Sequence, residues 1–353
     1  MDAPAAPETL RCDQPARFQV GAVDAIAAVA TPEGFAMLAA AGGSVNGWAY
    51  ELVDGQLIAT AQAVPITTSE AGAIGAATDG TTVMVTAIQG MPATGSALVP
   101  VDQQLASLGP PTMEVDLAVA NPIASGASGF AFATMNAATS GVDARLMAAF
   151  GVIVGAPVQI IDASEVPGYV SIIPNANGYA VTYTSAATNP NVDRIELLDA
   201  NLTVVAGPVT TSNSTNDAEA AHVAWAASSN AYLVAWDEKT STDGDEVWIQ
   251  MLGPNLEPVT QPRKIADHCY SPTVASDDTG FWLTWASYVN SPAPDFLDAA
   301  HVALDGTITP RAVTSSGGSP GQWTMVERLG QPVLVWAETG GSGPDLYLDP
   351  MCN

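Results

Sequence analysis

A short motif recurs seven times along the chain at nearly constant spacing. Each copy is a turn followed by an apolar strand: GFAMLA, GTTVMV, GFAFAT, GYAVTY, AYLVAW, GFWLTW and QPVLVW. The copies begin 46 to 53 residues apart, at Gly34, Gly80, Gly129, Gly178, Ala231, Gly280 and Gln331. This regularity predicts a repeat architecture in which each unit buries its apolar side against its neighbours.

Each unit also contains further short strands. A strand of small residues precedes the motif, as in AIAAVA (25–30) and AHVAWA (221–226), and another follows a second turn, as in LVDGQLIA and LDANLTVV. Four short strands in a unit of about 50 residues are typical of a β-propeller blade. We therefore predict an all-β fold, a seven-bladed β-propeller with four antiparallel strands per blade, lettered a to d from the centre outward.

The two ends of the sequence complement each other. The last unit stops after its third strand, LYLDPMCN, whereas LRCDQPARFQV (10–20) is a surplus strand before the first unit. We predict that this N-terminal strand completes the last blade and closes the ring, which leaves no open sheet edge between the ends. The predicted single domain has a flexible segment at 1–8 and blades at 21–68, 69–115, 116–162, 163–212, 213–266, 267–316 and 317–353 plus 9–20.

The repeated strand resembles that of secreted bacterial propeller proteins, in which Gly, an aromatic residue, Val or Leu, and Trp recur at fixed positions. The resemblance covers nearly the whole chain, but its motif is structural and implies no defined activity. Closure of the ring would bring Cys12 beside Cys352, and we predict a disulfide between them that stabilises the fold by a few kcal/mol. A disulfide implies an oxidising compartment, so we expect a secreted, periplasmic or cell-surface protein.

The charge balance excludes two classes of partner. The chain has 36 acidic and 9 basic residues, a formal net charge of −27. Such a surface repels nucleic acid and anionic lipid. No run approaches the roughly 20 apolar residues that span a bilayer, so we expect no membrane insertion. The opening MDAPAAPETL is similar to the start of a mature secreted protein. We expect a monomer.

The loops between strands b and c are longer and more variable than the a–b turns, and ligand-binding residues concentrate on such loops. Aspartates recur near the ends of these loops, and they either turn the chain into strand c or form a ring of carboxylates. Tyr288 and Phe296 are candidates for stacking on a ligand. The candidate ligand-binding residues on this face are Asp143, Asp193, Asp237, Glu238, His268, Tyr270, Tyr288, Asp295, Phe296, Glu338 and Asp345.

The loop at 237–246 has the highest density of carboxylates. Asp243, Asp245 and Glu246 are candidate ligands for Ca²⁺, which needs six to eight oxygens; the alternative is a solvated turn between two strands. The stretch STDGDEVW also resembles the Asp-box of sialidases, S-x-D-x-G-x-T-W, but Asp245 and Val247 replace its Gly and Thr. We interpret that match as coincidence. Ca²⁺ is the one cofactor that the sequence suggests.

No catalytic signature is present: there is no G-x-S-x-G elbow, no HExxH and no phosphate-binding loop. His222 and His268 could form a metal pair at the channel mouth, but structural roles are favoured. We therefore predict a non-catalytic extracellular binding protein that recognises a glycan or a protein through its b–c loops. A polysaccharide hydrolase or lyase that uses carboxylates at the channel mouth, and a metal-binding surface protein, stay open as alternatives.

Overall fold

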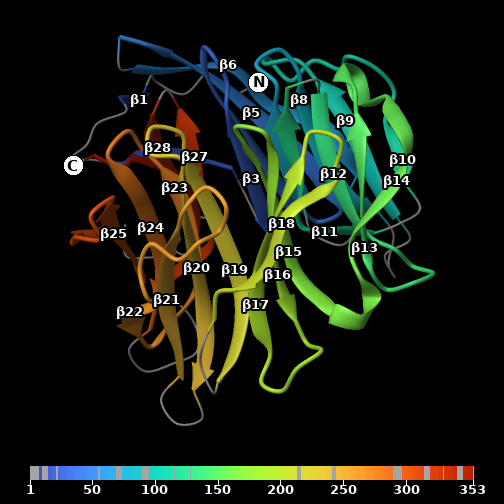
Figure 1. The fold of residues 1–353 in the computed structure, drawn as a ribbon. Coiled ribbons are helices and arrows are strands. Elements are labelled where there is room, and N and C mark those ends of the chain that lie inside the picture. Colours follow the sequence, from blue (N-terminus) through green and yellow to red (C-terminus); the bar gives the residue numbers. More distant parts are fainter. Residues whose placement is uncertain are drawn as a thin grey trace. The chain divides into compact units, whose positions relative to one another are not determined.

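The computed structural model describes residues 8–9, 15–20, 23–54, 56–68, 74–89, 95–114, 117–127, 129–212, 216–240, 244–288, 296–313, 319–328, 330–339 and 345–352. It confirms the predicted fold class: the chain is an all-β, seven-bladed β-propeller with four antiparallel strands in each blade (Figure 1). The residues divide into two compact units, each described by itself below. No helix in the described ranges is long and apolar enough to cross a bilayer.

The first unit holds blades one, two and seven. The strands of blade one are β3 (Ala25–Ala30), β4 (Gly34–Ala41), β5 (Ser44–Val53) and β6 (Gln56–Thr68). Those of blade two are β7 (Ile74–Thr78), β8 (Val83–Gln89), β9 (Gly95–Val101) and β10 (Thr112–Glu114). Those of blade seven are β27 (Ser319–Arg328), β28 (Gln331–Thr339), β29 (Asp345–Pro350) and β2 (Ala16–Gln19).

The second unit holds blades three to six. Blade three consists of β11 (Leu117–Gly126), β12 (Gly129–Met135), β13 (Val142–Met147) and β14 (Ile153–Ile161). Blade four consists of β15 (Pro167–Asn175), β16 (Gly178–Ser185), β17 (Val192–Asp199) and β18 (Val204–Thr210). Blade five consists of β19 (Asp217–Ala226), β20 (Ala231–Thr240), β21 (Gly244–Leu252) and β22 (Arg263–Asp267). Blade six consists of β23 (Cys269–Ser276), β24 (Gly280–Ser287), β25 (Phe296–Ala303) and β26 (Ile308–Ala312). This unit also holds the short 3₁₀ helix η2 (Ala163–Glu165), whereas the 3₁₀ helix η1 (Ala149–Gly151) belongs to the first unit.

The N-terminal strand completes the last blade, as predicted. β2 pairs antiparallel with β29, with Phe18 opposite Leu346. Arg17 adds an ion pair, because its Nε donates to Oδ2 of Asp345 at 2.9 Å. Cys12 lies outside the described residues, so its disulfide with Cys352 stays a prediction.

The chain before β2 differs from the expectation in one respect. Residues 8–9 form a fifth strand of blade one, β1 (Glu8–Thr9), in which Glu8 lies opposite Leu57 of β6. The last residue of the segment predicted to be flexible, 1–8, therefore lies in a strand. Of residues 9–20, which were predicted to complete blade seven, those in the strand that pairs with this blade are 16–19. The outer edge of β6 offers unpaired backbone groups, which explains why a passing segment pairs there.

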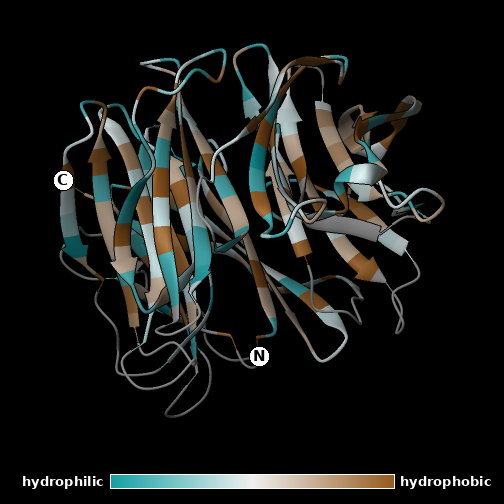
Figure 2. Ribbon diagram, turned by 60° about the horizontal axis from the view of Figure 1, so that its bottom comes forward, coloured by the Kyte–Doolittle hydropathy of each residue, from teal (hydrophilic) through white to brown (hydrophobic). Residues whose placement is uncertain are grey.

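The core consists of apolar layers between successive sheets, and strand alternation decides which layer a residue joins. Along β20, Tyr232, Val234 and Trp236 pack with residues of blade four, whereas Leu233 and Ala235 pack with residues of blade six. Figure 2 shows the apolar residues in bands along the strands. The same alternation continues into the polar end of β20, where Asp237 and Lys239 take the side toward blade six.

The innermost strands of blades four, five and six share an irregularity at the b–c end. Each shifts register there, and each has a non-glycine residue with positive φ, namely Tyr169 (46°), Ala220 (57°) and Ser271 (51°). Such a β-bulge re-aims the side chains around it, and the left-handed backbone is strained for these residues. The bulges recur every 51 residues, so they belong to the repeat.

Candidate functional site: polar residues between blades five and six

A group of polar side chains lies where blade five packs on blade six, at the b–c end. Glu219 of β19 is opposite Asp237 of β20, and Lys239 of β20 is opposite Asp245 of β21. Opposite residues on paired strands share a sheet face, so all four project toward blade six. We call these four residues, together with Tyr270 and Tyr288 of blade six, the five–six site.

Asp237 is the most deeply buried carboxyl group of this site. It is 6% exposed, and its Oδ1 has no hydrogen-bond partner within the described residues. The backbone N–H of Ser271, at the bulge of blade six, donates to its carboxylate. Burial, followed by the charges of Asp245 and Glu219, raises the pKa of Asp237 to about 7. This carboxyl group is therefore partly protonated at neutral pH.

Lys239 is the cation of the site. Its Nζ lies 2.6 Å from Oε1 of Glu219, and this hydrogen bond raises the pKa of the lysine. The Lys239 side chain is 52% exposed, while that of Glu219 is 19% exposed. The other lysine of the sequence, Lys264, also lies on blade five and pairs with Glu246 and Asp267 at 3.2 and 2.7 Å. Both lysines thus offset carboxylates of the same blade.

Aromatic side chains form the blade-six part of the site. The hydroxyl of Tyr288 accepts a hydrogen bond from the backbone N–H of Asp245 at 3.2 Å. The Tyr288 ring lies 6.0 Å from that of Tyr270 and 5.9 Å from that of His268. Burial, then the neighbouring Tyr288 and Asp245, raise the pKa of Tyr270. The structure therefore brings together four predicted ligand-binding residues, Asp237, His268, Tyr270 and Tyr288, with the calcium candidate Asp245.

A second pair of predicted residues lies where blade four packs on blade five: Asp193 is in β17 of blade four, and Glu238 is in β20 of blade five. Asp193 is fully buried and accepts a hydrogen bond from Oγ1 of Thr184 at 2.6 Å. Burial raises its pKa well above the ordinary value, and the charges of Asp237, Glu219 and Glu238 act in the same direction. Glu238 is 1% exposed and accepts from Nε1 of Trp236 at 3.0 Å. These two carboxyl groups are buried structural groups that influence the five–six site electrostatically.

The recurring aspartates do not occupy equivalent positions. Asp345 pairs with the residue two beyond Trp336, and Asp245 with the residue three beyond Trp236. Asp193 pairs with the residue directly after Tyr183, which takes the place of those tryptophans. Because the registers differ, these aspartates do not form a ring of equivalent carboxylates. Asp295 lies outside the described residues.

Three predicted residues have structural partners in their own blades. Asp143 accepts from Nδ2 of Asn136 at 2.7 Å, and Asp345 pairs with Arg17. The Asn136–Asp143 bond lies in the turn into strand c of blade three, whereas the Arg17–Asp345 pair joins strands c and d of blade seven. Glu338 is 3% exposed and accepts from Nε1 of Trp336 at 3.0 Å. Phe296, the first residue of β25, is half-buried opposite Ser287.

The calcium candidates do not converge on one point. Asp243 lies outside the described residues, and Asp245 and Glu246 are consecutive in β21, so they project to opposite faces of the sheet. The Glu246 oxygens are used by Trp248 Nε1 at 3.0 Å and by Lys264. No group of three or more His, Cys, Asp or Glu residues in the described ranges is placed to hold a metal ion. His222 is neutral at physiological pH, because burial lowers its pKa to about 4 even though part of its side chain reaches solvent.

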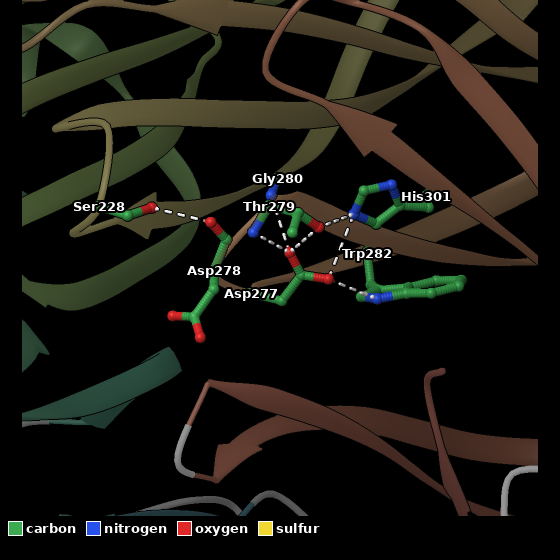
Figure 3. A network of polar contacts seen from close by, with 7 residues as sticks. All are labelled: Ser228, Asp277, Asp278, Thr279, Gly280, Trp282 and His301. Carbon is green, nitrogen blue, oxygen red and sulfur yellow. Dashed lines mark hydrogen bonds and ion pairs between the residues drawn. The ribbon is translucent and has the colours of Figure 1, made fainter. Parts of the chain in front are cut away.

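The third histidine belongs to a closed network at the a–b turn of blade six (Figure 3). Asp277 accepts from Gly280 N at 2.7 Å and Trp282 Nε1 at 3.0 Å, and lies 3.2 Å from His301 Nε2. Burial acts to raise the pKa of Asp277, but hydrogen bonds, chiefly from Thr279, lower it overall. The carboxylate is fully used within the turn, so this network holds the turn in place.

Sequence reasoning missed two members of the five–six site, Glu219 and Lys239. Glu219 lies inside strand β19, away from the loops that the sequence pointed to. Lys239 lies in the predicted loop 237–246, of which the structure places residues 237–240 in strand β20, but only the carboxylates of that loop were predicted as ligands. The available signal was the alternation in AYLVAWDEKT, which places Asp237 and Lys239 on one face. Glu219 was harder to find, because the bulge at Ala220 breaks the alternation of β19.

Comparisons with known proteins identify the fold. No family model matches the sequence, and no curated protein matches it. A chain of a crystal structure of the mitotic checkpoint complex is 11% identical, with a TM-score of 0.52 over 100% of this chain and 98% of that chain. The WD40 domain of Toxoplasma gondii coronin is 12% identical, with a TM-score of 0.52 over 98% and 87%. A streptogramin B lyase is 12% identical, with a TM-score of 0.50 over 96% and 97%. At these identities the likeness shows a β-propeller fold and no particular activity.

Proposed function

We propose that the chain is a non-catalytic binding protein that recognises a protein ligand at the five–six site. The observation that carries this proposal is the gathering of half-buried Tyr270 and Tyr288 with Asp245 around the buried carboxyl group of Asp237. Aromatic side chains that surround a few charged groups are typical of the energetically dominant centres of protein interfaces. The propeller fold supports the proposal by analogy, since a mitotic checkpoint complex contains a chain of the same fold.

A protein ligand is favoured over a glycan because of charge. The carboxyl groups of the site raise one another's pKa, so a positively charged group would relieve their repulsion. A neutral sugar offers hydroxyl groups but no charge. The net charge of −27 acts in the same direction, since it attracts basic partners.

The test compares two arrays probed with the same labelled protein variants. One array carries peptides of acidic, neutral and basic sequence, and the other carries glycans. The proposal expects peptides that the wild-type protein retains and that a Tyr270→Ala/Tyr288→Ala variant loses. Val205→Ala, at an exposed position of β18, is the matched control and should retain them. Retention of glycans alone, or peptide retention that the double variant preserves, would contradict the proposal.

One observation favours a second candidate, a hydrolase or lyase that acts on an extracellular polymer. A carboxyl group with a pKa of about 7, such as that of Asp237, can act as a general acid at neutral pH beside a second carboxylate, here Asp245. Incubation with a panel of polysaccharides tests this candidate. Turnover by the wild-type protein that Asp237→Asn abolishes would replace the binding proposal, and absence of turnover would reject the enzyme.

The proposal includes a location outside the reducing cytoplasm and a monomeric protein. The predicted Cys12–Cys352 disulfide and the resemblance to secreted propeller proteins support the location. Fractionation of cells that produce the full-length protein would test it, and gel filtration combined with light scattering would test the monomer.

A further inference from the structure

We propose that the five–six site binds an alkyl-ammonium group in the position that the chain's own Lys239 now holds. This inference rests on the proposed function and specifies its ligand chemistry: the side chain of a lysine on a protein ligand, or a free amine of the same kind. In both cases the ammonium group would lie between Glu219 and Asp245, above Asp237.

The five–six site has more acceptor groups than Lys239 satisfies. Glu219, Asp237 and Asp245 interact electrostatically, and Lys239 is the cation bonded to Glu219. Asp237 is 94% removed from solvent, yet within the described residues its Oδ1 has no partner. A buried acceptor without a partner destabilises the folded state. A cation that satisfies it therefore recovers stability on binding.

The side chain of Lys239 can leave the site and be replaced by the ammonium group of a ligand. The Lys239 side chain is half exposed and forms a salt bridge with Glu219. A half-exposed lysine can rotate its ammonium group into water at small cost, because ion pairs near the surface contribute little to stability. Its departure would uncover the carboxylates for an external group of the same chemistry.

A further argument is the chemistry of the surroundings. Tyr270 and Tyr288 lie beside the carboxylates, and aromatic rings attract cations through their faces. A divalent metal needs a convergent set of several ligands. The described part of the chain has no group of three or more metal-ligating side chains placed for one. An alkyl-ammonium group carries three N–H donors. Glu219 accepts from Lys239 in the present structure, and Oδ1 of Asp237, which has no partner within the described residues, and the carboxylate of Asp245 are further acceptors on the same face of the sheet.

The first experiment replaces Lys239 and supplies the missing group. Lys239→Ala should lower Tm, because three carboxylates then lack their cation. n-Butylammonium chloride should restore it by on the order of 2–4 °C at saturating concentration, relative to sodium chloride of equal ionic strength. Lys264→Ala, on the same blade, is the matched control and should show no rescue. Lys239→Gln serves as the second variant if Lys239→Ala does not fold. Equal rescue by sodium chloride, or equal rescue of Lys264→Ala, would overturn the proposal.

The second experiment uses the wild-type protein and separates the two sources of the ammonium group. Probes are a lysine-containing peptide retained on the array, its lysine-acetylated copy, and spermidine. Acetylation should weaken binding at least about tenfold, since a buried charge-assisted hydrogen bond contributes about 1.5–3 kcal/mol. Lys239→Ala should bind the unmodified peptide more tightly than wild type, and Asp245→Asn should bind it more weakly. Tighter binding of spermidine than of any peptide would identify a free amine as the ligand.

The outcomes distinguish this inference from the proposed function. If peptides bind at the five–six site equally well before and after lysine acetylation, the ammonium proposal fails while the binding function stands. If no peptide binds but n-butylammonium rescues Lys239→Ala, the ammonium site stands and the protein-binding function fails.

Discussion

The indole nitrogen of Trp236 donates a hydrogen bond to the carboxylate of Glu238, two residues further along β20, at 3.0 Å. Trp336 and Glu338 of blade seven repeat this bond at the same distance. Trp285 occupies the equivalent position in blade six, but Ser287 stands where the glutamate would be, and in the described part of the chain the indole nitrogen has no partner. Blades five and seven therefore have a Trp–Glu hydrogen bond at this position of the repeat, and blade six does not.

This difference predicts unequal effects for the same substitution. Trp236→Phe removes ring area and also leaves the buried carboxylate of Glu238 without its donor, whereas Trp285→Phe removes ring area alone. We expect Trp236→Phe to lower the free energy of unfolding by about 1–3 kcal/mol more than Trp285→Phe. Urea unfolding followed by circular dichroism measures both. Equal losses would show that the hydrogen bond contributes nothing net.

The closure of the last blade predicts the state of the cysteines. We expect a thiol assay in denaturant without reductant to find one free thiol per chain, that of Cys269, which is buried and free. Cys352→Ser should lower the free energy of unfolding by about 2–5 kcal/mol. Cys269→Ala is the control and should leave the cross-link intact in peptide mapping. Three free thiols in the wild-type protein would contradict the predicted Cys12–Cys352 bond.

Buried Glu196 predicts a stability that falls as pH rises. Burial, followed by the charge of Glu165, raises the pKa of Glu196 from 4.5 to about 7. The folded state then binds more protons than the unfolded state between these values, so the free energy of unfolding decreases across that range. Glu196→Gln should remove this decrease and should be more stable than wild type at pH 8, by on the order of a few kcal/mol.

The control for Glu196 has the opposite sign. Backbone N–H groups, chiefly that of Thr203, lower the pKa of exposed Asp199 in the c–d turn of the same blade. Asp199→Asn should therefore be less stable than wild type at pH 8, and this difference should shrink near pH 3, where the aspartate of the unfolded wild-type chain is protonated. Urea unfolding at pH 3, pH 5 and pH 8 measures both variants. If the difference between Glu196→Gln and wild type does not change with pH, the raised pKa is wrong.

The fold could be predicted from the sequence because apolar residues recur at the same positions in each repeat. The strand that begins at Gly178 and the strand that begins at Ala231 carry the same alternation, so they take the same place in blades four and five. Pairing of Phe18 with Leu346 also follows from a pattern, since the last unit lacks a strand that the first residues supply. The sequence shows Trp236 two residues before Glu238, but this spacing alone does not report the hydrogen bond between them.

The site could be predicted only in part. Its residues come together because they project from the same face of a sheet, whereas the prediction relied on the length of the loops. Asp237 and Glu238 are neighbours in sequence, yet the first faces blade six and the second faces blade four. Glu219 reaches Lys239 although a left-handed residue, Ala220, follows it, and no residue type at that position signals the bulge. The loop aspartates looked equivalent because spacing in sequence does not report register across a pair of strands.

The last prediction concerns the electrostatic coupling inside the five–six site. Burial raises the pKa of Asp245 and the nearby Glu219 adds to this, whereas the positive charge of Lys239 lowers it. Lys239→Met retains the length of the side chain and removes its charge, so it should raise the pKa of Asp245 further. Lys264→Met, which removes the same charge from the other face of blade five, should leave that pKa where it is in wild type.

Carboxyl-carbon NMR titration of protein labelled at aspartate measures this coupling directly. The resonance of Asp245 should shift its midpoint upward in Lys239→Met, and that of Asp237 should titrate near pH 7 in the wild-type protein. The groups around Asp237 are Asp193 from β17, Glu219 and His222 from β19, Lys239 from β20, Asp245 from β21, and Cys269 and Tyr270 from β23. His222, Cys269 and Tyr270 are all expected to be uncharged at pH 7, because burial lowers the pKa of His222 and raises those of Cys269 and Tyr270. The titration near neutrality therefore reports on Asp237 among its acidic neighbours. An Asp237 midpoint near pH 4 would mean that its carboxylate is solvated, and the site would then lack the buried acceptor on which ammonium binding depends.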